Sequence, residues 1–286
     1  MNLRNLRYLR FNSSTARDIL QHFYTPGKSY PVWFGPLRGM SLHYDRSVNF
    51  HAVLGLWDPE TFELLMRVFV AGGLLPRDAV IADVGSNIGY YALWFARRAA
   101  DAGRIYAFEP NPDVLVTLRG NLERNGIENV EVVESACGDH AGTVEFFLAP
   151  HHHCSSLHAD WAGEGSRSVT ADMTTLDEFF APGSRRPAPR FIKIDIEGGG
   201  TFALPGCRRI FSEDRPFVLI ESHTPLEDQA ISDVLCTFNY HGYRLGDRAW
   251  VTKPEAVFPD AEGVRGTLLL IPSEHRARVN GLLGQI

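Results

Sequence analysis

The sequence predicts an α/β fold with a doubly wound, mostly parallel sheet of seven strands and an N-terminal helical extension. Two observations carry this prediction. From residue 79 onward, short apolar stretches alternate with stretches of helical length. The apolar stretches are also nearly continuous, as in strands that are covered by helices on both faces. Together these features indicate a Rossmann-like arrangement.

Composition limits the classes of function. The chain has 286 residues, of which 44% are hydrophobic, enough for a full globular core. Its net charge of -6 argues against a nucleic-acid partner. No apolar run is long enough to span a bilayer, and the four cysteines form no CxxC pair. We therefore expect a cytoplasmic protein with no membrane partner, and we leave a homodimer open.

The first 75 residues are expected to form a separate lid-like extension, followed by one domain over residues 76–286. Residues 14–23 and 58–73 have helical patterns, the second beginning with Asp58 as N-cap and Pro59 in the first turn. Residues 35–45 resemble a hairpin because of their closely spaced glycines and proline.

The second domain is expected to follow a regular order. Strands are predicted at residues 79–85, 104–110, 130–136, 190–198, 216–223, 243–246 and 266–273. Helices are predicted at residues 89–103, 112–126, 174–181 and 226–242, and residues 143–149 and 168–173 read as an inserted strand pair. Thr175 and Glu178 have the spacing of a capping box.

The first strand ends in a pattern that suits a nucleotide-like cofactor. Asp83 ends the strand, and Gly85 and Gly89 permit a tight turn before a helix begins. Their Gly-x-x-x-Gly spacing differs from the dinucleotide fingerprint, and an acid at this point disfavours a pyrophosphate. Glu109 ends the second strand, where a carboxylate can accept hydrogen bonds from both ribose hydroxyls. The pattern predicts an adenosine-type cofactor without a phosphate bridge.

An ordered set of motifs then resembles one family. The stretches "DVGSNIGYYALWFA", "FEPNP", "TTLDEF" and "IKIDIEG" occur in this order. They resemble the FkbM family of class I S-adenosylmethionine-dependent methyltransferases, over roughly residues 35–245. The resemblance implies that S-adenosyl-L-methionine is the cofactor. It also implies these cofactor-binding residues: Asp83, Gly85, Ser86, Asn87, Gly89, Glu109, Pro110, Ser135, Ala136 and Asp195.

Several of these positions have specific implied roles. Asn87 stands where many methyltransferases have a glycine, and its amide would bond the methionine carboxylate. Ser135 and Ala136 would lie near the adenine. Ser135 replaces the Asp that many class I enzymes use to contact the adenine amine.

Acidic residues and one histidine follow the fourth and fifth strands. Asp195 and Glu197 lie on one face of the strand with Lys193, and Glu221 and His223 follow the next strand. Methyl transfer from a sulfonium needs a base to take a proton from the acceptor, and these four acid and imidazole groups are our catalytic candidates. His223 can be neutral near pH 7 and so could serve as a base without extensive tuning.

The close carboxylates also raise the question of a metal. Two carboxylates pointing the same way repel unless one is protonated or a cation lies between them, and Lys193 or a divalent ion would serve. Oxygen ligands favour Mg²⁺ or Ca²⁺ over zinc, so we leave Mg²⁺ open as a second cofactor. The His-rich stretch from His151 to His158 is expected to be a mobile loop, with zinc as the alternative.

The sequence thus predicts a methyltransferase that forms an O-methyl group on a small molecule. The family suggests sugars, glycosides or polyketide natural products as acceptors. The alternatives are N-methylation and a cofactor-binding protein without turnover. The chain departs from the family at Gly200, where a Glu is common. A large gain in turnover of a Gly200→Glu variant would identify the chain as an impaired enzyme.

Overall fold

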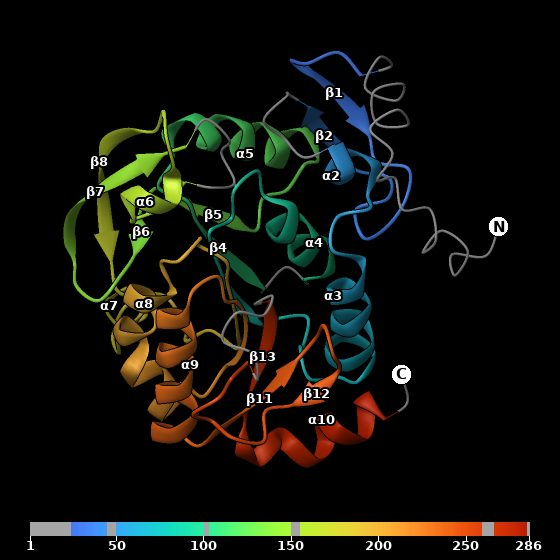
Figure 1. Ribbon diagram of the computed structural model, residues 1–286. Coiled ribbons are helices and arrows are strands. Elements are labelled where there is room, and N and C mark those ends of the chain that lie inside the picture. Colours follow the sequence, from blue (N-terminus) through green and yellow to red (C-terminus); the bar gives the residue numbers. More distant parts are fainter. Residues whose placement is uncertain (1–23, 45–49, 100–102, 150–154, 259–265, 285–286) are drawn as a thin grey trace. The chain divides into compact units, whose positions relative to one another are not determined.

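The computed structural model describes residues 24–44, 50–99, 103–149, 155–258 and 266–284 (Figure 1). The chain divides into two compact units, Met1–Trp57 and Asp58–Ile286. The expected boundary between residues 75 and 76, and the role of the first part as a lid, stay predictions.

The described part of the first unit is a hairpin followed by a short helix. Strand β1 (Lys28–Pro31) pairs antiparallel with β2 (Ser41–Tyr44), and α2 (Phe50–Leu54) follows. The hairpin predicted at residues 35–45 therefore begins earlier than expected: the prediction included β2 and missed β1. The helix predicted at residues 14–23 lies outside the described residues.

The second unit begins with the helix predicted over residues 58–73. It consists of α3 (Pro59–Leu64) and the π-helical segment η2 (Leu65–Ala71). Asp58 occupies the expected N-cap position, but its backbone is left-handed, with φ of 45°, and its side chain accepts no backbone N–H of the helix. Its carboxylate instead accepts the hydroxyls of Thr61, at 2.7 Å, and of Tyr91.

The main sheet of this unit has eight strands in the order β12-β11-β13-β10-β9-β3-β4-β5. The parallel strands are β3 (Val80–Val84), β4 (Arg104–Phe108), β5 (Val130–Val133), β9 (Phe191–Ile194) and β10 (Phe217–Glu221). The antiparallel strands are β11 (Tyr240–Arg244), β12 (Ala249–Trp250) and β13 (Thr267–Pro272). The mostly parallel doubly wound fold is confirmed. The prediction of seven strands missed β12, because two residues are too few to give a periodic signal.

Helices cover both faces of the sheet. On one face, Phe191 and Phe217 meet Phe69 of η2 at ring-centroid distances of 5.1 and 5.0 Å. On the other face, Ile192 and Val218 belong to a buried cluster with α7, α8 and α9. Neighbouring residues in a strand point to opposite faces, so a strand covered on both faces is apolar along most of its length.

The remaining helices lie between strands, apart from the last one, which follows β13 (Figure 1). They are α4 (Tyr90–Arg98), α5 (Pro112–Arg124), α6 (Ala159–Ala162), α7 (Leu176–Phe179), α8 (Gly200–Ala203), α9 (Pro225–Thr237) and α10 (Arg276–Leu283). Short 3-10 and π-helical segments are η4 (Pro205–Cys207), η5 (Ile210–Asp214) and η6 (Ser273–His275). Helix α7 has the predicted N-cap, since the Thr175 side chain accepts the N–H of Glu178.

A second small sheet is inserted between β5 and β9. It contains β6 (Ala136–Cys137), β7 (Gly142–Leu148) and β8 (Arg167–Thr174), in the order β6-β8-β7. The antiparallel β7–β8 pair confirms the predicted insertion. Among the described helices, none has the length and apolar character needed to cross a membrane.

Candidate active site

The glycine turn after β3 lies against the end of β9. Gly85 has a φ of +74°, and a Cβ atom at this position would lie 2.0 Å from the backbone oxygen of Asp195. Gly89, with a φ of +87°, directly precedes α4. Only glycine allows both this backbone conformation and this approach. The turn that follows the predicted cofactor strand β3 therefore packs against the end of the predicted catalytic strand β9.

A buried charge pair lies beside this turn. The side chain of Asp83 is fully buried, and neither of its oxygens accepts a hydrogen bond from the described residues. The Lys193 ammonium lies 3.5 Å from Asp83 Oδ1 and donates to the Gly85 carbonyl at 2.8 Å. Burial raises the pKa of Asp83, although Lys193 opposes the rise. The Asp83 carboxylate thus has a cation nearby but an unfilled capacity to accept hydrogen bonds.

Glu109 is held by backbone donors. Its Oε2 accepts the N–H of Asn87 at 2.8 Å, and its Oε1 accepts the N–H of Asn111 at 2.9 Å. Burial raises the pKa of Glu109 to about 7 in spite of these two bonds. Each oxygen keeps capacity for a further donor. Asn87 Oδ1 accepts the N–H of Ile88 at 2.8 Å, which directs its NH₂ group to other partners.

The other predicted cofactor residues have mainly local contacts. The Ser86 hydroxyl donates to the Asp83 carbonyl at 2.7 Å, and the Ser135 hydroxyl donates to the Ala136 carbonyl at 3.0 Å. Ser135 and Ala136 are buried, and Pro110 directly follows Glu109. Their contacts with a cofactor stay predictions.

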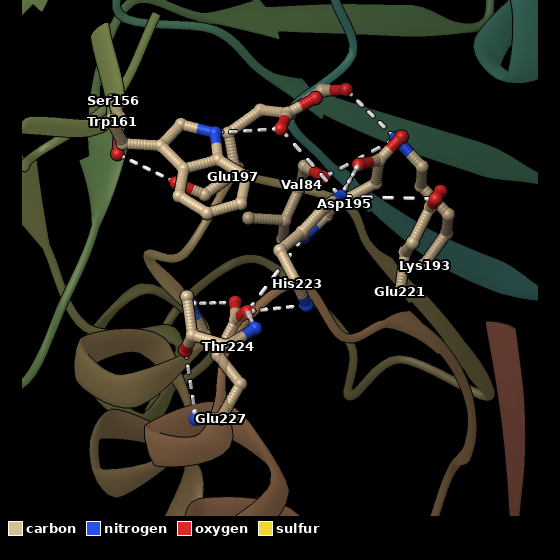
Figure 2. Close-up of polar contacts among 12 residues, drawn as sticks. Val84, Ser156, Trp161, Lys193, Asp195, Glu197, Glu221, His223, Thr224 and Glu227 are labelled. Atoms are coloured by element: carbon tan, nitrogen blue, oxygen red, sulfur yellow. Dashed lines mark hydrogen bonds and ion pairs between the residues drawn. The ribbon is translucent and has the colours of Figure 1, made fainter. Parts of the chain in front are cut away.

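Three carboxylates surround one imidazole at the ends of β9 and β10 (Figure 2). The Nε2 atom of His223 lies 3.8 Å from Asp195, 3.6 Å from Glu197 and 3.7 Å from Glu221. On the other side of the ring, Nδ1 lies 3.7 Å from Glu227. All four catalytic candidates from the sequence are therefore neighbours.

This arrangement shifts the pKa values of the carboxylates and of the imidazole in the cluster. Burial raises the pKa values of Glu197 and Glu221 to about 7, and the nearby Asp195 carboxylate adds to the rise. Burial alone would lower the pKa of His223, but the carboxylates around it raise that pKa to about 9. A pKa of about 9 makes His223 an imidazolium at pH 7 in this cluster, whereas its ordinary pKa would leave the ring largely neutral.

Glu227 determines where His223 lies, and it was not among our predicted site residues. Its fully buried carboxylate accepts the backbone N–H groups of His223 at 2.7 Å, Thr224 at 3.1 Å and Gly200 at 3.0 Å. Burial would raise the pKa of Glu227, but these bonds and His223 lower it. The Thr-x-x-Glu capping box at the start of α9 was a readable signal for this residue.

Trp161 is a second residue that sequence reasoning missed. Its indole N–H donates to Glu197 Oε2 at 2.8 Å, and its ring lies 5.6 Å from that of His223, edge to face. The Ser156 hydroxyl, five residues before Trp161, donates a hydrogen bond to the Glu197 carbonyl at 2.6 Å. Figure 2 shows Ser156 and Trp161 beside Glu197 at the edge of the cluster. No local sequence pattern links a tryptophan in the short helix α6 to an acid 36 positions later.

The cluster offers a donor set for a divalent metal. Asp195, Glu197 and His223 each provide one ligand atom, and these atoms lie within 4.8 Å of one another. With a pKa of about 9 the His223 ring is protonated at pH 7, so a metal and a proton would compete for its Nε2 atom. Of the His-rich loop, residues 151–154 lie outside the described residues. His158 stacks on Phe202, with ring centroids 5.2 Å apart.

Gly200 begins α8 directly against Glu227. A Cβ atom at Gly200 would lie 2.8 Å from Glu227 Oε1. The space that a side chain at this position would enter is thus filled by a carboxylate from α9.

Comparisons with known proteins agree with these features. The model of the methyltransferase FkbM domain matches residues 83–245. Hexuronic acid methyltransferase AglP of Haloferax volcanii is 28% identical over 159 residues, 56% of this chain and 62% of that protein. AMB antimetabolite synthetase AmbE of Pseudomonas aeruginosa is 36% identical over 126 residues, 42% of this chain and 6% of that protein. The chain thus spans less than two thirds of these relatives.

A solved structure is also similar. Methyltransferase FkbM from Methylobacillus flagellatus has 20% sequence identity and a TM-score of 0.47, over 78% of this chain and 55% of that one. The family match covers more than half of the chain and includes the glycine turn, Glu109 and the cluster around His223. The chain belongs to the FkbM family of methyltransferases.

Proposed function

We propose that this protein transfers a methyl group from S-adenosyl-L-methionine to a hydroxyl group of a small molecule such as a sugar, a glycoside or a polyketide. The single observation that carries the proposal is the contact between two sites. The Gly85 turn lies directly against Asp195, which borders the cluster of Glu197, Glu221 and His223. A cofactor bound at the turn is thereby next to groups that can handle protons.

The residues present fit this cofactor. Asp83 has a buried carboxylate without hydrogen-bond donors, and Glu109 keeps acceptor capacity at the end of β4. In the proposal, Glu109 holds the ribose hydroxyls and Asp83, Gly85 and Asn87 surround the methionine part. The cofactor supplies an electrophilic methyl group on a sulfonium.

The protein's own chemistry is to orient the acceptor and to remove its proton. Glu221 is the strongest candidate for the base, because its side chain is 43% exposed and its pKa is about 7. A base with this pKa is ionised in a useful fraction at neutral pH. His223, as an imidazolium, keeps Glu221, Glu197 and Asp195 close together in spite of their like charges.

N-methylation is a second candidate, favoured by the charge of the accessible groups. Asp195 and Glu221 are the most exposed members of the cluster, with side-chain exposures of 30% and 43%. Carboxylates in such a position attract an ammonium group as well as hydroxyl donors. The two functions differ in the acceptor atom and share the cofactor and the base.

Two measurements test the proposal. Calorimetry should show one molecule of S-adenosylmethionine bound per chain, and release of S-adenosylhomocysteine should be followed with neutral, amine-bearing and acidic sugars. Glu221→Gln should reduce turnover at least about a hundredfold, the usual contribution of a general base, with cofactor affinity nearly unchanged. Glu123→Gln, an exposed change on α5, is the matched control. Absence of cofactor binding would refute the proposal, and full activity of Glu221→Gln would refute the role of Glu221.

A further inference from the structure

Lys193 is a buried cation between the two parts of the site. Its side chain is 5% exposed, and its ammonium lies 3.5 Å from Asp83 and 3.7 Å from Asp195. It donates to the Gly85 carbonyl at 2.8 Å and lies 3.5 Å from the Val84 carbonyl. One ammonium therefore contacts the end of β3, the glycine turn and the first residue after β9.

Lys193 remains charged in this position. Burial would lower its pKa, but Asp83, Asp195 and Glu221 raise it above the ordinary value. The face of the Tyr91 ring is also close, with its centroid 5.3 Å from Nζ. A charged group buried among carboxylates acts over a longer range than an exposed one, because little water screens it.

The cofactor and its product differ in charge, and the buried cation must act on that difference. S-adenosylmethionine has a positive sulfonium, whereas S-adenosylhomocysteine has a neutral thioether in the same place. Carboxylates near this atom favour the cofactor, and a fixed positive charge weakens that preference. A contact that only holds the turn in place affects both ligands equally.

We propose that Lys193 is a positioning and selectivity residue: it holds the Gly85 turn against Asp83 and Asp195, and its charge reduces the preference for the sulfonium cofactor over the thioether product. This inference rests on the proposed cofactor. It assigns two separable effects to one side chain. Loss of positioning weakens both ligands, and loss of charge changes the ratio of their affinities.

The test is calorimetric titration of each variant with S-adenosylmethionine and S-adenosylhomocysteine at pH 8, where Glu197 and Glu221 are mostly ionised. Lys193→Met should weaken both ligands. It should also raise the ratio of cofactor to product affinity several-fold, up to about tenfold, because the removed positive charge no longer opposes the sulfonium. Lys193→Arg keeps the charge and should weaken both ligands with an unchanged ratio.

The controls separate the possible failures. Lys253→Met makes the same chemical change at an exposed position after β12 and should alter neither affinity. Lys193→Gln keeps a donor for the Gly85 carbonyl and should show the altered ratio if Lys193→Met does not fold. An unchanged ratio in the folded neutral variants would overturn the inference. Failure of the wild-type protein to bind either ligand would instead refute the proposed function.

Discussion

Gly200→Glu would place a new carboxylate where the structure already has one. The Cβ atom alone would lie 2.8 Å from Glu227 Oε1, 3.3 Å from its Cγ and 3.4 Å from its Cδ. Glu227 cannot easily retreat, because it accepts the backbone N–H groups of Gly200, His223 and Thr224. The variant should therefore lose both stability and the position of His223, rather than gain turnover.

The expected loss of unfolding free energy follows from two terms. Overpacking of a filled site costs about 1–3 kcal/mol. A second carboxylate beside a buried one adds a few kcal/mol, through desolvation and like-charge repulsion. We expect Gly200→Glu to lower the unfolding free energy by about 3–5 kcal/mol and Gly200→Ala by about 1–2 kcal/mol, since better helix propensity offsets part of the contact.

Urea unfolding followed by circular dichroism measures these losses. Gly281 of α10 is the matched control, because a Cβ there meets no atom within 4 Å. Gly281→Ala should stabilise the protein by up to about 1 kcal/mol. The double variant with Gly200→Glu and Glu227→Ala should be at least about 1 kcal/mol more stable than the sum of the two single losses predicts. Equal stability of wild type and Gly200→Glu, or simple additivity in the double variant, would refute the reasoning.

Four further predictions follow from the site. The folded-state pKa of His223 is raised to about 9, so its stabilising contribution is complete below pH 6.5 and is lost as pH rises toward 9; the wild type should lose up to about 3 kcal/mol more over this range than His223→Gln in urea unfolding. Trp161→Phe removes a bond that lowers the pKa of Glu197; a more fully protonated Glu197 raises the pKa of Glu221 less, so the acid limb of the pH–rate profile, set by Glu221, should move to lower pH. Gly85→Ala should abolish cofactor binding, measured by calorimetry, whereas Gly126→Ala should unfold only about 1 kcal/mol more easily, because its Cβ would meet open space. Treatment with EDTA should leave turnover unchanged, because the His223 proton provides the cation among the carboxylates.

Each of these predictions has a control or a contrary result. Trp250→Phe also removes one indole hydrogen bond, to Asn280, and should leave the pH–rate profile unchanged. Parallel stability curves of wild type and His223→Gln between pH 6.5 and 9 would contradict the raised pKa. Cofactor binding by Gly85→Ala would contradict the close approach to Asp195. Activity that is lost with EDTA and restored by Mg²⁺ or Mn²⁺ would assign the cluster to a metal.

Much of the fold could be read locally. Continuous apolar strands and helix patterns depend on neighbours in the chain, so the order of strands and helices from residue 79 was predictable. The glycine turn was predictable too, because glycine is the residue type that readily adopts the positive φ found at Gly85 and Gly89. The proximity of the four catalytic candidates was predictable as well, since the carboxyl ends of neighbouring parallel strands meet at one edge of the sheet.

The tertiary structure alone decided how these groups behave. Burial and proximity, which a pattern cannot measure, raise the pKa of His223 to about 9 and those of Glu197 and Glu221 to about 7. Folding also brings Trp161 to Glu197, and it places Glu227 in the space beside Gly200. From the sequence, "FIKIDIEGGG" is a strand with acids that lacks one carboxylate. In the structure a carboxylate from α9 lies beside that position, because helices distant in sequence pack against the same strand end.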